Sequence, residues 1–196
     1  MDQYHTQTVS ELQESNEKRS GFLRFVVDIV ETLILSVILF AAINAVSARI
    51  RVDGASMEPT LQSGEFVIVN KLAYVIGQPK IADVIVFHFP RDPEQEYIKR
   101  VIGLPGDQVV IQEGRVTVNG QLLEEEYIAA SPVYEATLDV PSDSLFVLGD
   151  NRNNSSDSHS WGPVPVEYVV GKAVLIYWPP TEWGMISQIS TASAAH

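Results

Sequence analysis

The chain changes its pattern of hydrophobic and polar positions twice. Residues 1–20 are mostly polar without regular spacing of apolar positions, which predicts a disordered tail over residues 1–21. Residues 32–48 (TLILSVILFAAINAVSA) carry no charge, and residues 22–30 before them are largely apolar. From residue 49 onward, apolar residues come in short runs. The pattern predicts a tail, one long hydrophobic helix and a mostly β domain.

The hydrophobic segment over residues 22–48 predicts a transmembrane anchor, since a spanning helix needs about 20 mostly apolar residues. Two other interpretations stay open. Basic residues before the segment and the small residues Val46-Ser47-Ala48 at its end resemble a cleaved signal peptide, although the polar region before it is long for one. A buried helix of a soluble protein is the third interpretation.

Basic side chains flank the uncharged run of residues 32–48 on both sides: Lys18, Arg19, Arg24, Arg49 and Arg51. The bias toward the N-terminal side is small, and the positive-inside rule therefore leans only slightly toward a cytoplasmic N-terminus. With this orientation, residues 1–21 form a cytoplasmic tail and the domain of residues 49–182 is extracytoplasmic.

Short runs rich in Val, Ile, Leu and Phe, separated by Gly, Pro and Asp, predict the strands of the domain. They cover residues 66–69, 84–87, 109–111, 145–148, 169–170 and 173–177. Residues 115–122 predict a hairpin, because Asn119-Gly120 supplies the positive φ of a type I′ turn. No long amphipathic helix is expected after residue 50. We expect a β-sheet or barrel domain, then a C-terminal tail over residues 183–196 that is either disordered or a short surface helix.

Composition excludes several classes of function. The net charge is -12, with 25 acidic against 13 basic residues, which argues against nucleic-acid binding because that needs a basic surface. The chain has no cysteine, so a disulfide, a thiol nucleophile and a cysteine-ligated metal are all excluded.

Ser56 and Lys99 are the candidate reactive pair. A serine hydroxyl is a poor nucleophile until a base removes its proton. Lys99 has Ile98 and Val101 near it on an expected strand, and burial there would lower its pKa and leave the amine neutral. Taken singly, such residues are more often a turn serine and an exposed strand lysine. Together they suggest a Ser/Lys hydrolase at a membrane surface.

The four histidines offer a different base. His5 and His196 lie in the expected tails, and His88 alternates within an expected strand, which favours a structural role. His159, two residues after Asp157, is the better candidate for a functional histidine.

Four blocks, in order behind the hydrophobic segment, resemble those of bacterial type I signal peptidases, which are membrane-bound Ser/Lys proteases. They are SMEPTL at 56–61, DVIVF at 83–87, YIKRVIGLPGD at 97–107, and GDNRNNSSDSH at 149–159 followed by Trp161-Gly162. The resemblance covers about residues 30–180. Asn153 and His159 stand where many relatives have aspartate and arginine, a pattern similar to the cyanobacterial and plastid branch.

This resemblance implies a role for each site residue. Ser56 would attack the carbonyl before the cleavage site of an exported preprotein, with Lys99 as the general base. Ser155 would hydrogen-bond to the lysine amine, and Asp157 would support the site. The backbone N–H of Ser56 would bind the oxyanion, while Gly54 stands where many relatives have a hydroxyl residue as second donor.

The resemblance also implies the substrate and the partners. The family cleaves after small residues, commonly Ala-X-Ala. By the resemblance, six residues should line its shallow substrate pockets, and some of them should also be core positions: Ile50, Val52, Met57, Leu61, Tyr97 and Ile98. Preproteins with signal peptides and the lipid bilayer are the implied partners, with the translocation machinery as a further candidate. No nucleic acid, metal or organic cofactor is implied, and the catalytic domain would face the periplasm or the thylakoid lumen.

Two rival functions stay open. A self-cleaving, repressor-like Ser/Lys protease carries a DNA-binding module in place of an anchor, which the hydrophobic segment disfavours. A catalytically inactive, membrane-anchored β domain that binds or scaffolds partners is disfavoured by the intact candidate set Ser56, Lys99, Ser155 and Asp157. A Ser-x-x-Lys site fails at Pro59, and a Gly-x-Ser-x-Gly elbow fails at Glu58.

Overall fold

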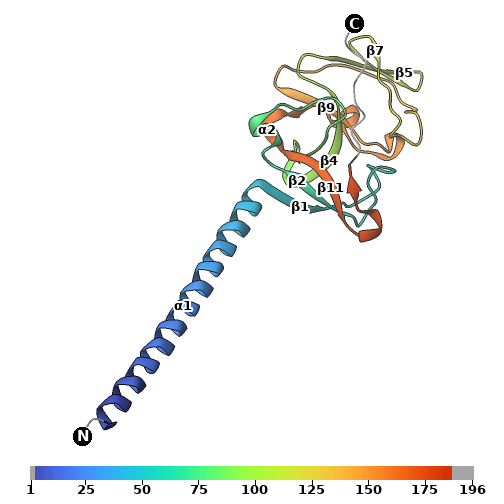
Figure 1. Cartoon of the computed structure of the whole chain (residues 1–196). Helices are drawn as coiled ribbons and strands as arrows, with labels where there is room; N and C mark the ends of the chain where they lie inside the picture. Colours follow the sequence, from blue (N-terminus) through green and yellow to red (C-terminus); the bar gives the residue numbers. More distant parts are fainter. Residues whose placement is uncertain (1–2, 187–196) are drawn as a thin grey trace. The chain divides into compact units, whose positions relative to one another are not determined.

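The structure is a computed structural model that describes the backbone of residues 3–186 and the side chains of residues 23–186. The chain divides into two compact units, Met1–Ala45 and Val46–His196. The first unit consists of the helix α1 (Gln3–Val46), which Figure 1 draws as one continuous helix.

The apolar part of α1, Leu23–Val46, has 24 residues, a mean hydropathy of 2.5 and no buried residue. It is long and apolar enough to cross a membrane. A helix in the core of a soluble protein would have buried side chains, and the exposure of this segment therefore contradicts that interpretation.

The expectation of a disordered tail over residues 1–21 was wrong from Gln3 onward, because α1 begins there. The segment contains no proline and many good helix formers, such as Gln, Glu, Leu and Lys. Extending an existing helix is far easier than starting one, and the apolar segment supplies the nucleus. Of the expected C-terminal tail, residues 187–196 lie outside the described residues.

Antiparallel strands in two sheets form the framework of the second unit. The larger sheet has the order β1-β2-β11-β3-β4-β9-β10, with β12 paired to β11. Its strands are β1 (Ser47–Arg51), β2 (Phe66–Asn70), β3 (Val84–Phe89), β4 (Asp92–Gly103), β9 (Ser144–Leu148), β10 (Val164–Pro165), β11 (Val169–Trp178) and β12 (Gly184–Met185).

The smaller sheet has the order β7-β6-β5-β8. Its strands are β5 (Gln108–Gln112), β6 (Arg115–Val118), β7 (Gln121–Leu122) and β8 (Ala136–Asp139). Only short helical turns interrupt the strands in the described part of this unit: α2 (Ala73–Ile76), α3 (Ser158–Trp161), η1 (Arg152–Asn154), η2 (Val166–Tyr168) and η3 (Pro180–Glu182).

The predicted strands are confirmed: they lie within β2, β3, β5, β9 and β11. The predicted hairpin is also confirmed, with Asn119 at φ 53° and Gly120 at φ 79° between β6 and β7. The expected domain boundary at residue 49 is close to the break at Val46. A mostly β fold behind one apolar helix is therefore what the structure shows.

Alternation along the strands divides the core of the larger sheet into two faces. Val84 and Val86 of β3 belong to a cluster that also holds Met57 and Leu61, from the loop between β1 and β2. Ile85 and Phe87 belong to a different cluster. The β1–β2 loop is therefore packed onto the sheet by its own apolar side chains.

A buried ion pair connects β4 to the loop after β9. Arg100 donates from Nε to Asp150 Oδ1 at 2.8 Å and from Nη2 to Oδ2 at 2.6 Å, and both side chains are fully buried. Arg100 also donates to the carbonyl oxygen of Ala82 at 2.9 Å and lies over the Tyr127 ring at 3.9 Å. Since this guanidinium has no access to water, the Asp150 carboxylate is its buried counter-charge.

We expect Asp150→Ala to lower the free energy of unfolding by about 3–5 kcal/mol, because it leaves a buried arginine without its counter-charge. Asp53→Ala is the matched control. It removes an exposed pair with Arg51, whose N···O distance is 3.9 Å, and should cost less than about 1 kcal/mol. Urea unfolding in detergent checks this by tryptophan fluorescence, since Trp161, Trp178 and Trp183 all lie after α1. Equal losses in the two variants would contradict the prediction.

Candidate active site

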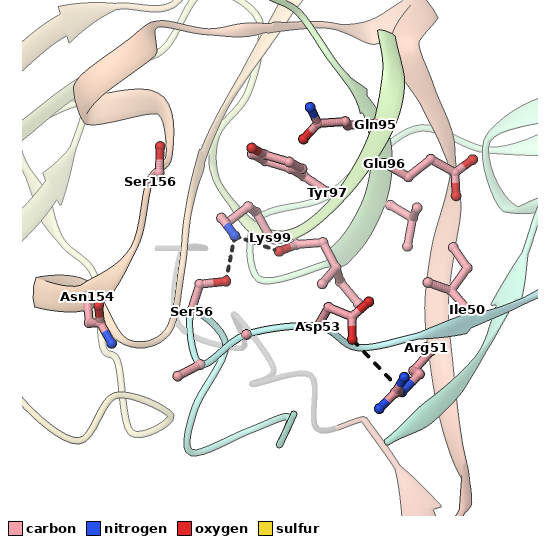
Figure 2. Close-up of a pocket in the computed structure, with 14 residues that line it drawn as sticks. Ile50, Arg51, Asp53, Ser56, Gln95, Glu96, Tyr97, Lys99, Asn154 and Ser156 are labelled. Atoms are coloured by element: carbon pink, nitrogen blue, oxygen red, sulfur yellow. Dashed lines mark hydrogen bonds and ion pairs between the residues drawn. The ribbon is translucent and has the colours of Figure 1, made fainter. Parts of the chain in front are cut away.

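Ser56 and Lys99 meet in the structure. Ser56 lies in the loop between β1 and β2, and Lys99 lies on β4. The Lys99 amine donates to Ser56 Oγ at 2.7 Å and to the carbonyl oxygen of Ile98 at 3.1 Å. Figure 2 shows both hydrogen bonds at the edge of a pocket. The two residues are therefore placed for proton transfer between Oγ and Nζ.

The environment of Lys99 favours the neutral amine. Lys99 is only 4% exposed, and burial lowers its pKa from 10.5 to about 8. The negative charges of Asp157 and Asp150 act in the opposite direction and keep the pKa from falling further. A substantial fraction of the amine is therefore unprotonated near pH 8.

Asn151, in the loop after β9, hydrogen-bonds to the β1–β2 loop that contains Ser56. Its side chain donates to the carbonyl oxygen of Ala55 at 3.0 Å, and its backbone N–H donates to the carbonyl oxygen of Ser56 at 3.0 Å. Because Asp150 next to it is paired with Arg100 on β4, the loop after β9 holds Ser56 and β4 in one arrangement.

Asp157 is a fully buried carboxylate behind this loop. Its Oδ2 accepts the backbone N–H of Gly149 at 2.9 Å, and its Oδ1 lies 2.5 Å from His159 Nδ1. Nδ1 carries the shared proton if the carboxylate is ionised, since a carboxylate only accepts. The Tyr134 ring stacks on His159 at a centroid distance of 3.9 Å. The sequence indicated the pair of Asp157 and His159 but not the tyrosine.

The expected hydrogen bond from Ser155 to the lysine amine is not present. Among the described residues, Ser155 Oγ has no hydrogen-bond partner although it is buried. The Lys99 amine instead contacts Ser56 Oγ and the Ile98 carbonyl oxygen. Ser155 Oγ lies close to Gly149, where an added methyl group would overlap both Ser155 Oγ and the Ser56 carbonyl oxygen.

A pocket of about 520 Å³ adjoins the serine and the lysine. Ile50, Tyr97 and Ile98 line it, as expected of substrate-binding residues, and so does Gly54. In Figure 2, Asn154 and Ser156 face the pocket from the side opposite to β4. The other three expected pocket residues do not line it: Val52, Met57 and Leu61 are buried in the core cluster beneath.

Gly54 has a backbone reason to be glycine. Its φ is +89°, a conformation that residues with a side chain rarely adopt, although an added Cβ would meet nothing within 4 Å. Its N–H donates to Ser63 Oγ at 3.3 Å. A hydroxyl residue here would therefore strain the backbone of this loop.

Two further residues support the site from outside the motifs. Glu125 forms a two-point ion pair with the buried Arg152. The guanidinium groups of Arg100 and Arg152 lie 3.9 Å and 5.8 Å from the centre of the Tyr127 ring. Glu125 and Tyr127 come from the irregular segment between β7 and β8, where sequence spacing predicts no contact. In the part of the chain that the structure describes, no group of three His, Asp or Glu side chains is placed to hold a metal.

The comparisons with known proteins identify the family. The family model described as signal peptidase, peptidase S26, matches residues 26–178. The chain is 43% identical over 165 residues to a probable signal peptidase I-2 from Synechocystis sp., covering 80% of this chain and 75% of the relative. It is 44% identical over 164 residues to a signal peptidase I from Leptolyngbya laminosa, covering 79% and 81%.

A plastid protein is also similar. Thylakoidal processing peptidase 1 of Arabidopsis thaliana is 39% identical over 142 residues, which cover 67% of this chain and 42% of that protein. These similarities confirm the expected cyanobacterial and plastid branch. The chain is thus a membrane protein with signal peptidase I activity that belongs to the signal peptidase family, peptidase S26.

Proposed function

We propose that this peptidase removes signal peptides by a Ser/Lys mechanism, with Ser56 as nucleophile and Lys99 as general base. The supporting observation is the 2.7 Å contact between Lys99 Nζ and Ser56 Oγ on a lysine that is only 4% exposed. A buried amine with a lowered pKa can accept a proton near neutral pH, whereas an exposed lysine cannot.

In the first step, the neutral Lys99 amine takes the hydroxyl proton while Ser56 Oγ bonds to the carbonyl carbon before the cleavage site. The backbone N–H of Ser56 stabilises the oxyanion. The Lys99 ammonium then gives its proton to the leaving amine as the C–N bond breaks. Lys99 next takes a proton from a water as the water oxygen bonds to the ester carbon. The C–Oγ bond then breaks, and the Lys99 ammonium returns the proton to Ser56 Oγ.

The loop after β9 supports this pair in our proposal. Asp157 holds the Gly149 backbone and places negative charge near the lysine, which keeps its pKa from falling too low. Ser155 Oγ and the Ser56 carbonyl oxygen both lie close to Gly149, so a methyl group added at Gly149 would overlap both atoms. We assign Ser155 as a hydroxyl that turns toward the amine once the acyl group occupies Ser56 Oγ.

The preprotein binds as an added strand in this proposal. β1 is an edge strand of the larger sheet, and the part of β4 before Arg100 pairs with β3 alone. Residues of both strands line the pocket, which gives an extended peptide backbone groups to pair with. The pocket is lined by Ile50, Tyr97 and Ile98. We assign to these side chains the preference for small substrate residues, as in Ala-X-Ala.

We assign residues 22–48 as the anchor and residues 49–182 as a catalytic domain on the extracytoplasmic side. An apolar span of 24 residues and the slight excess of basic residues before the uncharged run of residues 32–48 support this orientation. Signal peptides emerge from the bilayer on that side, so lipid is a partner, and the translocation machinery is a second one.

Ser56→Ala and Lys99→Met should each lower kcat about 10⁴-fold or more on an Ala-X-Ala preprotein in detergent, because they remove the nucleophile and the base. Lys99→Arg should be as inactive as Lys99→Met, since a guanidinium stays charged. Ser142→Ala and Lys80→Met, at exposed positions, are the controls and should keep wild-type rates. A folded Lys99→Arg with substantial activity would refute the Ser/Lys assignment.

The pH profile should show an acidic limb. Burial lowers the pKa of Lys99 to about 8, and only the unprotonated amine accepts the serine proton. We therefore expect kcat/KM for a soluble peptide to rise about tenfold per pH unit below pH 8 and to level off above it. A profile that is flat from pH 5 to pH 9 would show that another group is the base.

Gly149→Ala should lower kcat/KM by about 100-fold, because the added methyl group displaces the Ser56 backbone or Ser155. It should also lower the free energy of unfolding by about 1–3 kcal/mol. Gly184→Ala is the matched control: its nearest contact is 3.8 Å away, and it should behave as wild type. If Gly149→Ala retained full activity, the close approach of the two loops would have no catalytic role.

A further inference from the structure

A histidine contacts the buried carboxylate behind the catalytic lysine, and the proposed mechanism gives this histidine no role. His159 Nδ1, on α3, lies 2.5 Å from Asp157 Oδ1. The Asp157 side chain is fully buried, whereas the His159 side chain is 22% exposed. Water therefore reaches this pair through the imidazole ring, and a proton gained or lost there changes the net charge of the pair.

The contact between the two side chains is compatible with both charge states of the ring. Besides Nδ1, the Asp157 carboxylate accepts the Gly149 N–H at 2.9 Å and the His159 backbone N–H at 3.3 Å. A neutral imidazole that carries its proton on Nδ1 donates to the carboxylate, and the imidazolium donates through the same atom. Protonation of the ring therefore changes the charge of the pair without breaking its hydrogen bond.

Two residues from other segments hold the ring in this orientation. The Tyr134 ring stacks on His159 at a centroid distance of 3.9 Å and an interplanar angle of 16°. Asn153 donates to the Ser131 carbonyl oxygen and accepts the Val133 N–H, both at 2.9 Å, which holds the segment that leads to Tyr134. Because the face of an aromatic ring attracts a cation, the stack also favours the imidazolium.

The charge of Asp157 acts on the catalytic lysine. Burial lowers the pKa of Lys99 to about 8, and of the two carboxylates that oppose this, Asp157 has a larger effect than Asp150. Asp150 has a permanent counter-charge in Arg100. The counter-charge of Asp157 is a histidine instead, and the charge of a histidine can change with pH.

The other groups near the ring do not take over this role. Arg152 and Glu125, whose charges act on Tyr134, form an ion pair with each other. Burial raises the pKa of Tyr134, so the phenol stays neutral. Of the described side chains that contact the imidazole, Asp157 is therefore the one whose charge the ring can compensate.

We propose that His159 is a positioning residue that sets the net charge behind Lys99: its imidazolium compensates the Asp157 carboxylate, and its neutral form leaves that charge uncompensated. The inference rests on the proposed role of Lys99 as general base. As the pH falls and the ring gains its charge, the Lys99 ammonium loses part of the stabilisation that Asp157 gives it. A larger fraction of the amine then stays neutral, and the histidine extends the activity toward lower pH.

Two variants fix the charge at this position. His159→Asn keeps an N–H donor but is always neutral, and His159→Arg is always charged. The measurement is kcat/KM of the full chain in detergent on a soluble peptide from pH 5 to pH 9. The acidic limb of the arginine variant should lie about 0.5 pH unit below that of the asparagine variant, a roughly threefold difference in rate at one pH on the limb.

The wild-type limb should follow the asparagine variant at its upper end and the arginine variant at its lower end. His88→Asn, at an exposed histidine on β3, is the matched control and should superpose on the wild type. A structural role for His159 would lower the plateau of both variants and leave the limb at one pH. That result would overturn the inference and leave the Ser/Lys mechanism intact, whereas a flat wild-type profile would refute the mechanism itself.

A second measurement does not depend on activity or on the variants at residue 159. Coupling between two sites is reciprocal, so loss of the Lys99 ammonium in Lys99→Met should let His159 take up its proton at a pH about 0.5 unit higher. NMR of the full chain with ¹³C-labelled histidine rings follows this titration. Variants of the three other histidines assign the resonance by elimination: His5, His88 and His196.

Lys80→Met, which removes an exposed lysine, is the control and should leave the titration of the His159 ring where it is in the wild type. If Lys99→Met also left this titration unchanged, the two groups would not be coupled, and the inference would be overturned.

Discussion

Removal of the Lys99 amine from water is the constraint on which the rest of the site depends. An amine exposed to solvent stays protonated at neutral pH, and it then has no lone pair with which to accept the serine proton. Lys99 is buried on β4, next to the paired strand β3 and to the β1–β2 loop that contains Ser56. The nearby carboxylates of Asp157 and Asp150 act in the opposite direction and limit how far burial lowers the pKa of Lys99.

The next residue on β4 explains how this arrangement is held. Arg100 is fully buried and pairs with Asp150, and Asn151 beside it holds the backbone of Ala55 and Ser56. One loop therefore joins the strand that carries the lysine to the loop that carries the serine. Because the Arg100–Asp150 contact is buried and charge-assisted, it holds the loop after β9 against β4 more tightly than apolar packing alone would.

The strands β1 and β2 follow the apolar span directly in the chain. The span ends at Val46, whose carbonyl oxygen accepts a hydrogen bond from the Lys71 N–H. Leu72, Val75 and Ile76, which come after Lys71, are exposed. The same β1–β2 pair leads into the loop that contains Ser56. The strand that follows the span and the loop that contains Ser56 are thus consecutive in the chain.

Much of this was predictable from the sequence because it depends on local pattern. The apolar run defines the span, alternation and turn residues define the strands, and Asn119-Gly120 defines the hairpin. The motifs also indicated Ser56, Lys99 and the pair of Asp157 and His159. The tail was mispredicted because polar composition does not show that a long helix can extend into it.

Other features depend on contacts between segments that are distant in the chain. Val52, Met57 and Leu61 follow the same apolar pattern as Ile50, and only packing decides which of them reach the pocket. The support of Glu125 and Tyr127 for Arg152 and the stack of Tyr134 on His159 have no local signal. The same holds for the buried Ser155 hydroxyl, which has no hydrogen-bond partner among the described residues. The sequence by itself determined which groups are available for chemistry, because residue type and local spacing carry that information. Only the tertiary structure decided their protonation and their partners, because burial and electrostatic environment arise when separate strands and loops come together.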